Sequence, residues 1–184
     1  NLFSVKPRPR LRGFSLRGIF SKVGRSDILT DRIRVLFVCH GNICRSPMAE
    51  SYFDFLVRQR GYAGRFSVSS AATHTDELGN IPHYGTREKL AAEGIPLVPH
   101  RARLLTRQDG AEQDYILGMD SENLRYMRRI LGSCRAHTGL LLDYSARPRA
   151  IADPWYTGNF DETFSDISEG CNAFLEYLLR ERLI

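Results

Sequence analysis

The sequence predicts an α/β fold, an open doubly wound sheet of about four parallel strands with helices on both faces. Short apolar runs typical of buried strands alternate with segments of helical period along the 184 residues. The first strand, helix and second strand have the spacing of a βαβ unit, in which a right-handed crossover joins two parallel strands. A chain of this length also fits one domain with one core.

The first unit begins with an apolar, β-branched strand over residues 34–39. A helix follows from Ser46 and carries apolar residues at helical spacing as far as Val57, and Gly61 ends it. Residues 66–71 form the second strand, whose end is rich in small hydroxyl side chains. The carboxyl ends of both strands are therefore expected at one edge of the sheet.

The second unit continues the alternation of helices and strands. Gly94 ends one helix and Asp120 caps another, since glycine favours helix C-termini and aspartate favours N-caps. Helices are expected over about residues 84–93, 122–131 and 164–178, and strands over about 114–119 and 140–142. The topology brings Cys39, Ser70, Asp120 and the loop after Leu142 to the edge of the sheet where ligands bind.

A short loop from Cys39 to Arg45 joins the first strand to its helix. Five residues separate the thiol from the guanidinium, which lets a tight loop turn its backbone N–H groups around one tetrahedral anion. Arg45 adds bidentate hydrogen bonds to that anion. Gly41 takes a positive φ readily, and Asn42 tolerates one better than most residues. The loop is therefore predicted to be an anion site with a nucleophile at its base.

The start of the following helix favours the same prediction. Ser46 is expected as the N-cap and Pro47 at the first helical position, so the positive end of the helix dipole faces the loop. That field and Arg45 both favour the thiolate form of Cys39, which is the better nucleophile. The alternative is that Cys39 is a small buried hydrophobic residue, because a Cys and an Arg at this spacing also occur by chance.

A second candidate group follows the fourth strand. Displacement at phosphorus needs an acid that protonates the departing oxygen, and Asp153 suits this role. Pro154 stiffens its loop, and Trp155 and Tyr156 provide walls for a flat aromatic substrate. The alternative is an ordinary Asp-Pro turn.

Residues 39–47, Cys-His-Gly-Asn-Ile-Cys-Arg-Ser-Pro, resemble the signature loop of the low-molecular-weight protein tyrosine phosphatases. Further motifs of this family are matched by residues 69–73, by Gly94, Ile95, Pro96 and His100, by residues 114–116 with Met119, Asp120 and Asn123, and by residues 153–156. The resemblance extends over residues 34–179. It implies an enzyme that hydrolyses phosphotyrosine in proteins through a cysteinyl-phosphate intermediate and releases inorganic phosphate without a cofactor. It assigns Cys39 as nucleophile, Arg45 as phosphate clamp and Asp153 as general acid and then base.

The same resemblance implies supporting roles for other residues. Asn42, Ser70 and His100 correspond to a buried polar network that holds the loop, and Ser46 to a hydrogen-bond partner of the thiolate. Cys44 corresponds to a second cysteine that forms a reversible disulfide with the nucleophile, although an inert small residue is an equal alternative. Substrate contacts are implied for His40, Gly41, Asn42, Ile43, Cys44, Ser46, Trp155 and Tyr156.

Three residues near the loop depart from the family pattern. His40 stands where an aliphatic residue is common, and Asp76 and Glu77 stand where many relatives present an aromatic side chain. An acidic wall would disfavour acidic residues beside the phosphotyrosine and would favour basic ones. Substrate preference, and not the reaction, is therefore open.

Other proteins use a similar loop for other purposes. Protein-arginine phosphatases tend to carry Thr where Ile43 stands, and thiol-dependent arsenate reductases need a closely spaced cysteine pair that Cys134 lacks. A non-catalytic phosphate-binding module is the alternative from another class. The presence together of Cys39, Arg45 and Asp153 argues against it, because binding alone needs neither a thiolate nor an acid.

Cysteine usage and hydropathy limit the compartment and the cofactors. Four unevenly spread cysteines do not make a disulfide scaffold, and no C-x-x-C motif or His cluster predicts a zinc site. The sequence therefore predicts a reducing, cytoplasmic location and no metal. No apolar run approaches the roughly 20 residues of a membrane span, so a soluble protein is expected.

The net charge of +5 is concentrated at the N-terminus. Residues 1–30 hold seven basic residues and one acidic residue, a charge of +6 that leaves −1 for the rest of the chain. The remainder therefore gives no reason to expect a nucleic-acid partner, while the arm could touch acidic surfaces. Residues 1–30 are expected to form a mobile basic arm, and residues 31–184 the catalytic domain.

Overall fold

The strands form one parallel sheet in the order β2-β1-β3-β4 in a computed structural model that describes residues 32–184. The strands are β1 (Ile33–Cys39), β2 (Phe66–Ala72), β3 (Tyr115–Gly118) and β4 (His137–Leu140). The helices are α1 (Arg45–Gln59), α2 (Tyr84–Ala92), α3 (Arg107–Glu112), α4 (Ser121–Leu131), α5 (Pro154–Thr157) and α6 (Phe160–Arg180). The expected arm, residues 1–30, lies outside the described residues.

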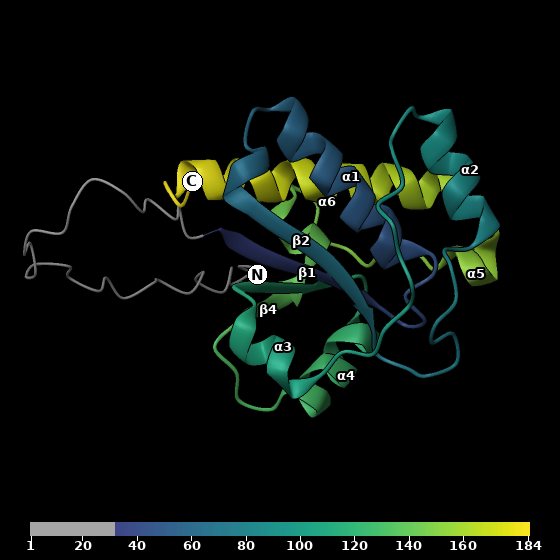
Figure 1. Cartoon of the computed structure of the whole chain (residues 1–184), viewed down its shortest axis with the longest axis horizontal. Coiled ribbons are helices and arrows are strands. Elements are labelled where there is room, and N and C mark those ends of the chain that lie inside the picture. Colours follow the sequence, from purple (N-terminus) through teal and green to yellow (C-terminus); the bar gives the residue numbers. More distant parts are fainter. Residues whose placement is uncertain (1–31) are drawn as a thin grey trace, which may run out of the picture.

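Helices cover both faces of the sheet, with α1 and α6 on one side and α3 and α4 on the other (Figure 1). The side chains of β1 alternate between two cores, because successive residues of a strand point to opposite faces. Val35 and Phe37 join the core beneath α1 and α6, whereas Leu36 and Val38 join the core beneath α4. The predicted doubly wound α/β fold is confirmed, and its central strand β1 leads directly into the predicted anion loop.

An aromatic cluster fixes α1 against the sheet. The fully buried Phe53 of α1 lies 5.7 Å from Phe37 of β1, 5.3 Å from Phe66 of β2 and 5.6 Å from Phe174 of α6, measured between ring centroids. Edge-on and tilted contacts of this kind stabilise beyond the area they bury. The helix that follows the loop is thus held by the sheet and by α6.

The predicted fourth strand was placed too late in the chain. Strand β4 ends at Leu140, which pairs with Gly118, and the next residues form a 3-10 turn, Leu141–Tyr144. Leu141 is buried against α6, where a Cβ on Gly170 would lie only 2.6 Å from its Cγ. The apolar run is therefore buried by a helix beyond the strand and not by sheet pairing.

Two helix starts also differ from the prediction. Helix α6 begins about one turn earlier than expected, because Asn159 Oδ1 accepts a hydrogen bond from the backbone N–H of Glu162 at 3.0 Å. The short helix α3 was not predicted, although Thr106 and Asp109 form a capping box at its start.

Within residues 32–184, no helix is both long enough and apolar enough to cross a membrane.

Candidate active site

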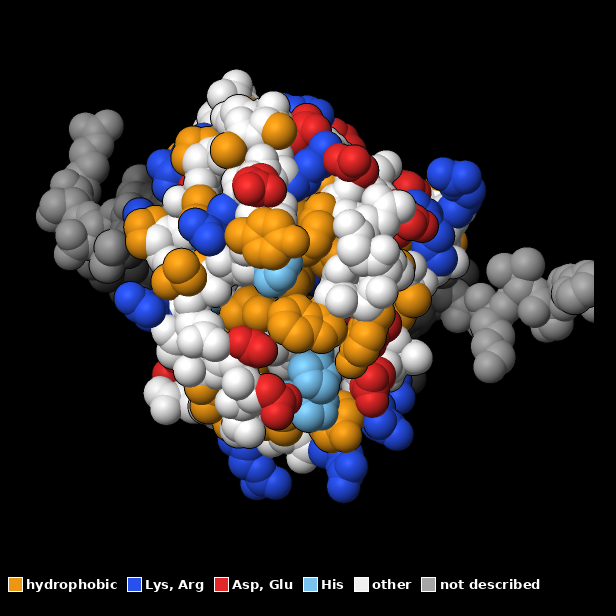
Figure 2. Space-filling view, turned by 90° about the vertical axis from the view of Figure 1, so that its right-hand side faces the viewer, with side chains coloured by type: hydrophobic (Ala, Val, Ile, Leu, Met, Phe, Trp, Pro, Cys, Tyr) orange, Lys and Arg blue, Asp and Glu red, His pale blue; other side chains and the backbone are white. Residues whose placement is uncertain are grey.

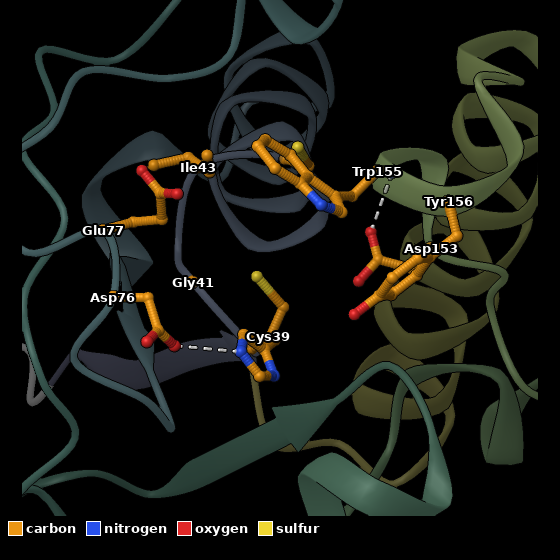
Figure 3. A pocket seen from close by; sticks show the side chains of 10 residues that line it. Cys39, Gly41, Ile43, Asp76, Glu77, Asp153, Trp155 and Tyr156 are labelled. Carbon is orange, nitrogen blue, oxygen red and sulfur yellow. Dashed lines mark hydrogen bonds and ion pairs between the residues drawn. The ribbon is translucent and has the colours of Figure 1, made fainter.

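A cavity of about 200 Å³ opens at the carboxyl end of β1. Figure 3 shows Cys39 at its base, Asp76 and Glu77 on one wall, and Asp153 and Tyr156 on the opposite wall. The lining residues are Cys39, His40, Gly41, Ile43, Cys44, Asp76, Glu77, Asp153, Trp155 and Tyr156. The fold thus brings the predicted nucleophile and the predicted acid to one cavity from positions far apart in the chain.

The turn between β1 and α1 uses a positive φ at Asn42, where φ is 58°, and not at Gly41. Asn42 was one of two residues expected to allow this conformation. Gly41 is required for a different reason, since a Cβ at this position would lie 3.0 Å from Glu77 Cγ. Its missing side chain lets the acidic wall of the cavity approach the loop backbone.

The fully buried Asn42 is the centre of a polar network. Its Nδ2 donates to Ser46 Oγ and to Ser70 Oγ, both at 2.8 Å, and its Oδ1 accepts from the backbone N–H of Arg103 at 3.1 Å. His100 Nε2 lies 2.9 Å from the carbonyl oxygen of Asn42. Asn42, Ser70 and His100 therefore lie together as expected, and their hydrogen bonds offset the cost of the positive φ.

Sequence reasoning missed Glu50 as a member of this network. The buried Glu50 carboxylate accepts a hydrogen bond from Ser70 Oγ at 2.6 Å and lies 3.4 Å from His100 Nδ1. The signal was its spacing, because Glu50 precedes the buried residues Phe53 and Val57 by three and seven positions and so shares the apolar face of α1.

The predicted N-cap of α1 was wrong. Helix α1 begins at Arg45 after Cys44, and no side chain caps it. Ser46 is the second helical residue, and its hydroxyl lies 3.1 Å from Cys39 Sγ, so it serves the thiol instead of the helix end. Every residue from 41 to 51 is buried. The first N–H groups of α1, which have no acceptor within the helix, are therefore part of the predicted anion site.

The guanidinium of Arg45 is only 2% exposed and forms ion pairs with two carboxylates. Its Nη1 donates to Asp120 Oδ2 at 2.6 Å and to the carbonyl oxygen of Ile151 at 3.1 Å, and its Nη2 pairs with Asp153. Burial opposes the positive charge, but the charges of Cys39, Asp153 and Asp120 and the hydrogen bond to Asp120 together outweigh it and raise the pKa of Arg45. Arg45 is therefore held as a fixed cation.

One N–H group of Arg45 has no partner. Its Nε is buried without a hydrogen bond, and Arg65 Nε is the other such side-chain atom in the described part of the chain. Leaving a buried donor unsatisfied costs about 1–3 kcal/mol. An acceptor bound in the loop would remove that cost.

Asp120 was predicted as a helix cap at the ligand-binding edge of the sheet, and the structure gives it two contacts. Its Oδ1 accepts from the backbone N–H of Asn123 at 2.7 Å, which caps α4 as expected, while Oδ2 holds Arg45. The sequence offers no signal for the second contact except that Asp120 and Cys39 both follow buried strands that pair in the sheet.

Asp153 begins a short helix as well as lining the cavity. Its Oδ1 accepts from the backbone N–H of Trp155 at 3.1 Å, and Pro154 is the first residue of α5. The Asp-Pro turn is thus real, and it places Trp155, 56% exposed, and Tyr156, 82% exposed, at the mouth of the cavity.

The mouth also carries an imidazole pair. The rings of His40 and His74 are stacked with centroids 3.8 Å apart, and His40 Nε2 lies 3.2 Å from Asp76 Oδ2. Burial and the proximity of His40 lower the pKa of His74. Two of the three residues that depart from the family pattern, His40 and Asp76, therefore contact each other at the mouth. Within the described residues no group of His, Cys, Asp and Glu is arranged to hold a metal ion.

Cys44 differs from Cys39 in its surroundings. It is buried, its carbonyl oxygen accepts from Thr86 Oγ1 at 3.2 Å, and burial together with the charges of Cys39 and Asp153 raises the pKa of its thiol to about 12. Fewer than about one Cys44 side chain in 10⁴ would carry a thiolate at pH 7. Cys44 is a poor nucleophile in the folded protein.

We expect iodoacetamide at pH 7 to leave Cys44 unmodified in the Cys39→Ser variant, because burial, the largest cause of its raised pKa, is unchanged there. Peptide mapping of the labelled protein measures this, and the half-buried Cys134 serves as an internal positive control. Denatured protein should label at every remaining cysteine. Modification of Cys44 at the rate of Cys134 in the native protein would contradict the expectation.

Comparison with known proteins agrees with this site. The family Low molecular weight phosphotyrosine protein phosphatase matches residues 34–183. Low molecular weight protein-tyrosine-phosphatase YfkJ of Bacillus subtilis is 42% identical over 153 residues, which are 82% of this chain and 98% of that protein. Its crystal structure superposes with a TM-score of 0.78 over 86% of this chain and 99% of that chain.

Two further relatives extend the comparison. The human Low molecular weight phosphotyrosine protein phosphatase is 41% identical over 148 residues, 77% of this chain and 93% of that protein. The crystal structure of DARP, a Drosophila arginine phosphatase, has a TM-score of 0.74 at 31% identity, over 79% of this chain and 97% of that chain. With a family match over residues 34–183 and relatives above 40% identity, the chain belongs to the low molecular weight phosphotyrosine protein phosphatase family.

Proposed function

We propose that this protein hydrolyses phosphotyrosine in proteins, with inorganic phosphate as the product, through a cysteinyl-phosphate intermediate and without a metal or other cofactor. Membership of the family and the names of its relatives support the reaction class. The catalytic domain is residues 31–184. The four cysteines are all free, which suits a reducing, cytoplasmic location.

In the first step, the Cys39 thiolate attacks phosphorus, so that an S–P bond forms as the bond between phosphorus and the tyrosine oxygen breaks. Asp153 gives its proton to the departing phenolic oxygen. Arg45 and the backbone N–H groups of the loop hold the oxygens of the transferring phosphoryl group. The Ser46 hydroxyl, 3.1 Å from the sulfur, stabilises the thiolate before attack and after release.

In the second step, the Asp153 carboxylate takes a proton from water, and the oxygen of that water attacks phosphorus as the S–P bond breaks. Inorganic phosphate leaves and the thiolate is restored. The ion pair between Asp153 and Arg45 is consistent with this cycle, because a phosphate that takes over Arg45 leaves the carboxyl group free to bind a proton.

The remaining assignments concern substrate and support. Ser70 and His100 support the loop through Asn42. His40, Gly41, Asn42, Ile43, Cys44 and Ser46 surround the phosphoryl group, and Trp155 and Tyr156 contact the aromatic ring of the substrate. The near burial of Ile43 gives the cavity an apolar side that suits a phenyl ring.

The single observation that carries the proposal is the buried Arg45 beside Cys39 and Asp153, with its Nε unpaired. The test compares phosphotyrosine, phosphoserine and phosphoarginine peptides of one sequence, with a chelator and no added metal. We expect turnover of the phosphotyrosine peptide at least roughly 10²-fold above that of the phosphoserine peptide, because the serine alkoxide is a much poorer leaving group. No turnover of any peptide would contradict the proposal.

A second candidate activity is protein-arginine phosphatase, which the likeness to DARP favours. The same three peptides decide between the two activities. Faster turnover of the phosphoarginine peptide would indicate that the substrate is phosphorylated on arginine and not on tyrosine. The roles proposed for Cys39 and Arg45 would stay the same.

A further inference from the structure

A second groove, of about 580 Å³, adjoins the catalytic cavity. It lies between one side of α2 and the residues from α5 to the start of α6, and Trp155 lines both the groove and the cavity. Figure 2 shows this face of the molecule, where aromatic, hydrophobic and His side chains gather around hollows with acidic side chains among them. A polypeptide whose phosphotyrosine enters the cavity can therefore place a neighbouring residue in this groove.

The wall of the groove is attached to the phosphate-binding loop. The backbone N–H of His83 donates to the carbonyl oxygen of Ile43 at 2.8 Å, and Thr86 Oγ1 donates to the carbonyl oxygen of Cys44 at 3.2 Å. Thr86 is buried and lies in the first turn of α2. The groove and the loop therefore keep a fixed relative position, which a specific subsite needs.

The groove presents aromatic surfaces to solvent. The His83 ring is stacked on Phe160 at 5.2 Å with an interplanar angle of 5°, and it lies 4.4 Å from the ring of Tyr84. Tyr84 is 60% exposed, and Trp155 on the opposite side also has more than half its surface exposed. Large exposed aromatic side chains gathered around a recess are typical of a contact surface.

The charges around the groove favour a cation. Glu88 lines it and forms no ion pair within residues 32–184. The one basic side chain on its wall, Lys89, is already neutralised, since its Nζ lies 2.6 Å from Glu93 and 2.7 Å from Asp161. In the adjoining cavity no Lys or Arg lines the wall, and the carboxylates there include Asp76 and Glu77.

We propose that this groove is a subsite for an arginine side chain that flanks the phosphotyrosine of a substrate polypeptide. The proposal rests on the proposed function and adds the class of peptide that the site selects. The planar guanidinium stacks on the exposed aromatic rings of Tyr84 and Trp155 and donates hydrogen bonds to the Glu88 carboxylate. An acidic side chain in the same place meets like charges, and a neutral one gains no ion pair.

The test uses phosphotyrosine peptides that carry either arginine or citrulline at one position, scanned over the three residues on each side of the phosphotyrosine. Citrulline keeps the shape and planarity of arginine and removes its charge. At the best position we expect kcat/KM for the arginine peptide to exceed that for the citrulline peptide by about 5- to 20-fold, mainly through KM, as suits one partly exposed ion pair with stacking.

Two variants assign this preference to the groove. Glu88→Gln and Tyr84→Ala should each at least halve the logarithm of the ratio between kcat/KM for the arginine peptide and kcat/KM for the citrulline peptide. Neither variant should change kcat/KM for 4-nitrophenyl phosphate. Glu176→Gln is the matched control, because Glu176 lies on α6 about 24 Å along the helix axis from Phe160 and should leave the ratio unchanged.

The outcomes separate this proposal from the proposed function. The subsite alone would be overturned if the enzyme hydrolysed the citrulline peptides and 4-nitrophenyl phosphate but showed no preference for arginine at any position. A preference that survives in both groove variants would also overturn it and would indicate Asp76 and Glu77 instead. Absence of hydrolysis of every phosphotyrosine peptide would overturn the proposed function, and binding of the same peptides to the protein would still report on the groove.

Discussion

Replacing Cys39 with serine is expected to lower phosphotyrosine turnover by roughly 10⁴-fold or more, the order found when a covalent nucleophile is removed from an enzyme. A serine hydroxyl has nearly the same shape as the thiol, but it ionises far less readily, and neither the loop N–H groups nor Ser46 can correct this. Binding of phosphate should persist, because Arg45 and the loop backbone are unchanged. The variant therefore separates binding from chemistry.

Both quantities can be measured on one sample. Turnover is followed with a phosphotyrosine peptide, and phosphate binding with the fluorescence of Trp155, the single tryptophan of the chain, which lines the cavity. Cys134→Ser is the matched control, since Cys134 lies outside the cavity and should keep wild-type turnover. Retention of activity in Cys39→Ser would remove Cys39 from the role of nucleophile.

Changing Asp153 to asparagine should slow the first chemical step on phosphotyrosine by roughly 10²–10⁴-fold, the usual range for a positioned acid. Asparagine keeps the size of the side chain and an oxygen that accepts from the backbone N–H of Trp155, so α5 should still begin at Pro154. An activated ester such as 4-nitrophenyl phosphate should be slowed much less in that step, because its leaving group hardly needs a proton.

The first step has to be isolated by a burst or single-turnover measurement. Asp153 is also proposed as the base of the second step, so steady-state rates would fall for both esters and would hide the difference. Equal slowing of the first step for the two esters would contradict the role of Asp153 as acid. Asp120→Asn is an informative comparison, since Asp120 also pairs with Arg45 but does not line the cavity, and its loss should affect both esters alike.

The elements whose formation depends on local sequence could be predicted well. The run into Cys39, the loop to Arg45 and the apolar stripe of the following helix specify a strand, an anion loop and a helix within a few residues of one another. The same holds for Asp120, whose cap of α4 needs only a residue three positions later. Near neighbours in the sequence decide such features, and the sequence displays them directly.

Features that depend on distant partners were the ones missed or misplaced. The second contact of Asp120 joins it to Arg45, 75 residues away, and the Glu50 contact with Ser70 spans 20 residues. Leu141 looked like part of a strand because the helix that buries it, α6, comes later in the chain. For Ser46 only the predicted N-cap was wrong, since its contact with Cys39 was expected from the family resemblance and its contact with Asn42 was not.

The unbroken burial of residues 41–51 has a consequence for motion. The carbonyl oxygens of Asn42, Ile43 and Cys44 lie within hydrogen-bond distance of His100, the backbone N–H of His83 and Thr86, so other segments of the chain hold the loop in place. The shape of the loop is then set before any ligand binds. Adapting the loop to a different ligand would require breaking buried hydrogen bonds. The exposed side chains of Trp155, Tyr156 and Tyr84 lie at the other extreme, where rotamers change within nanoseconds. The loop therefore presents the same rigid template to every ligand, whereas the aromatic side chains at the mouth of the cavity can change their orientation.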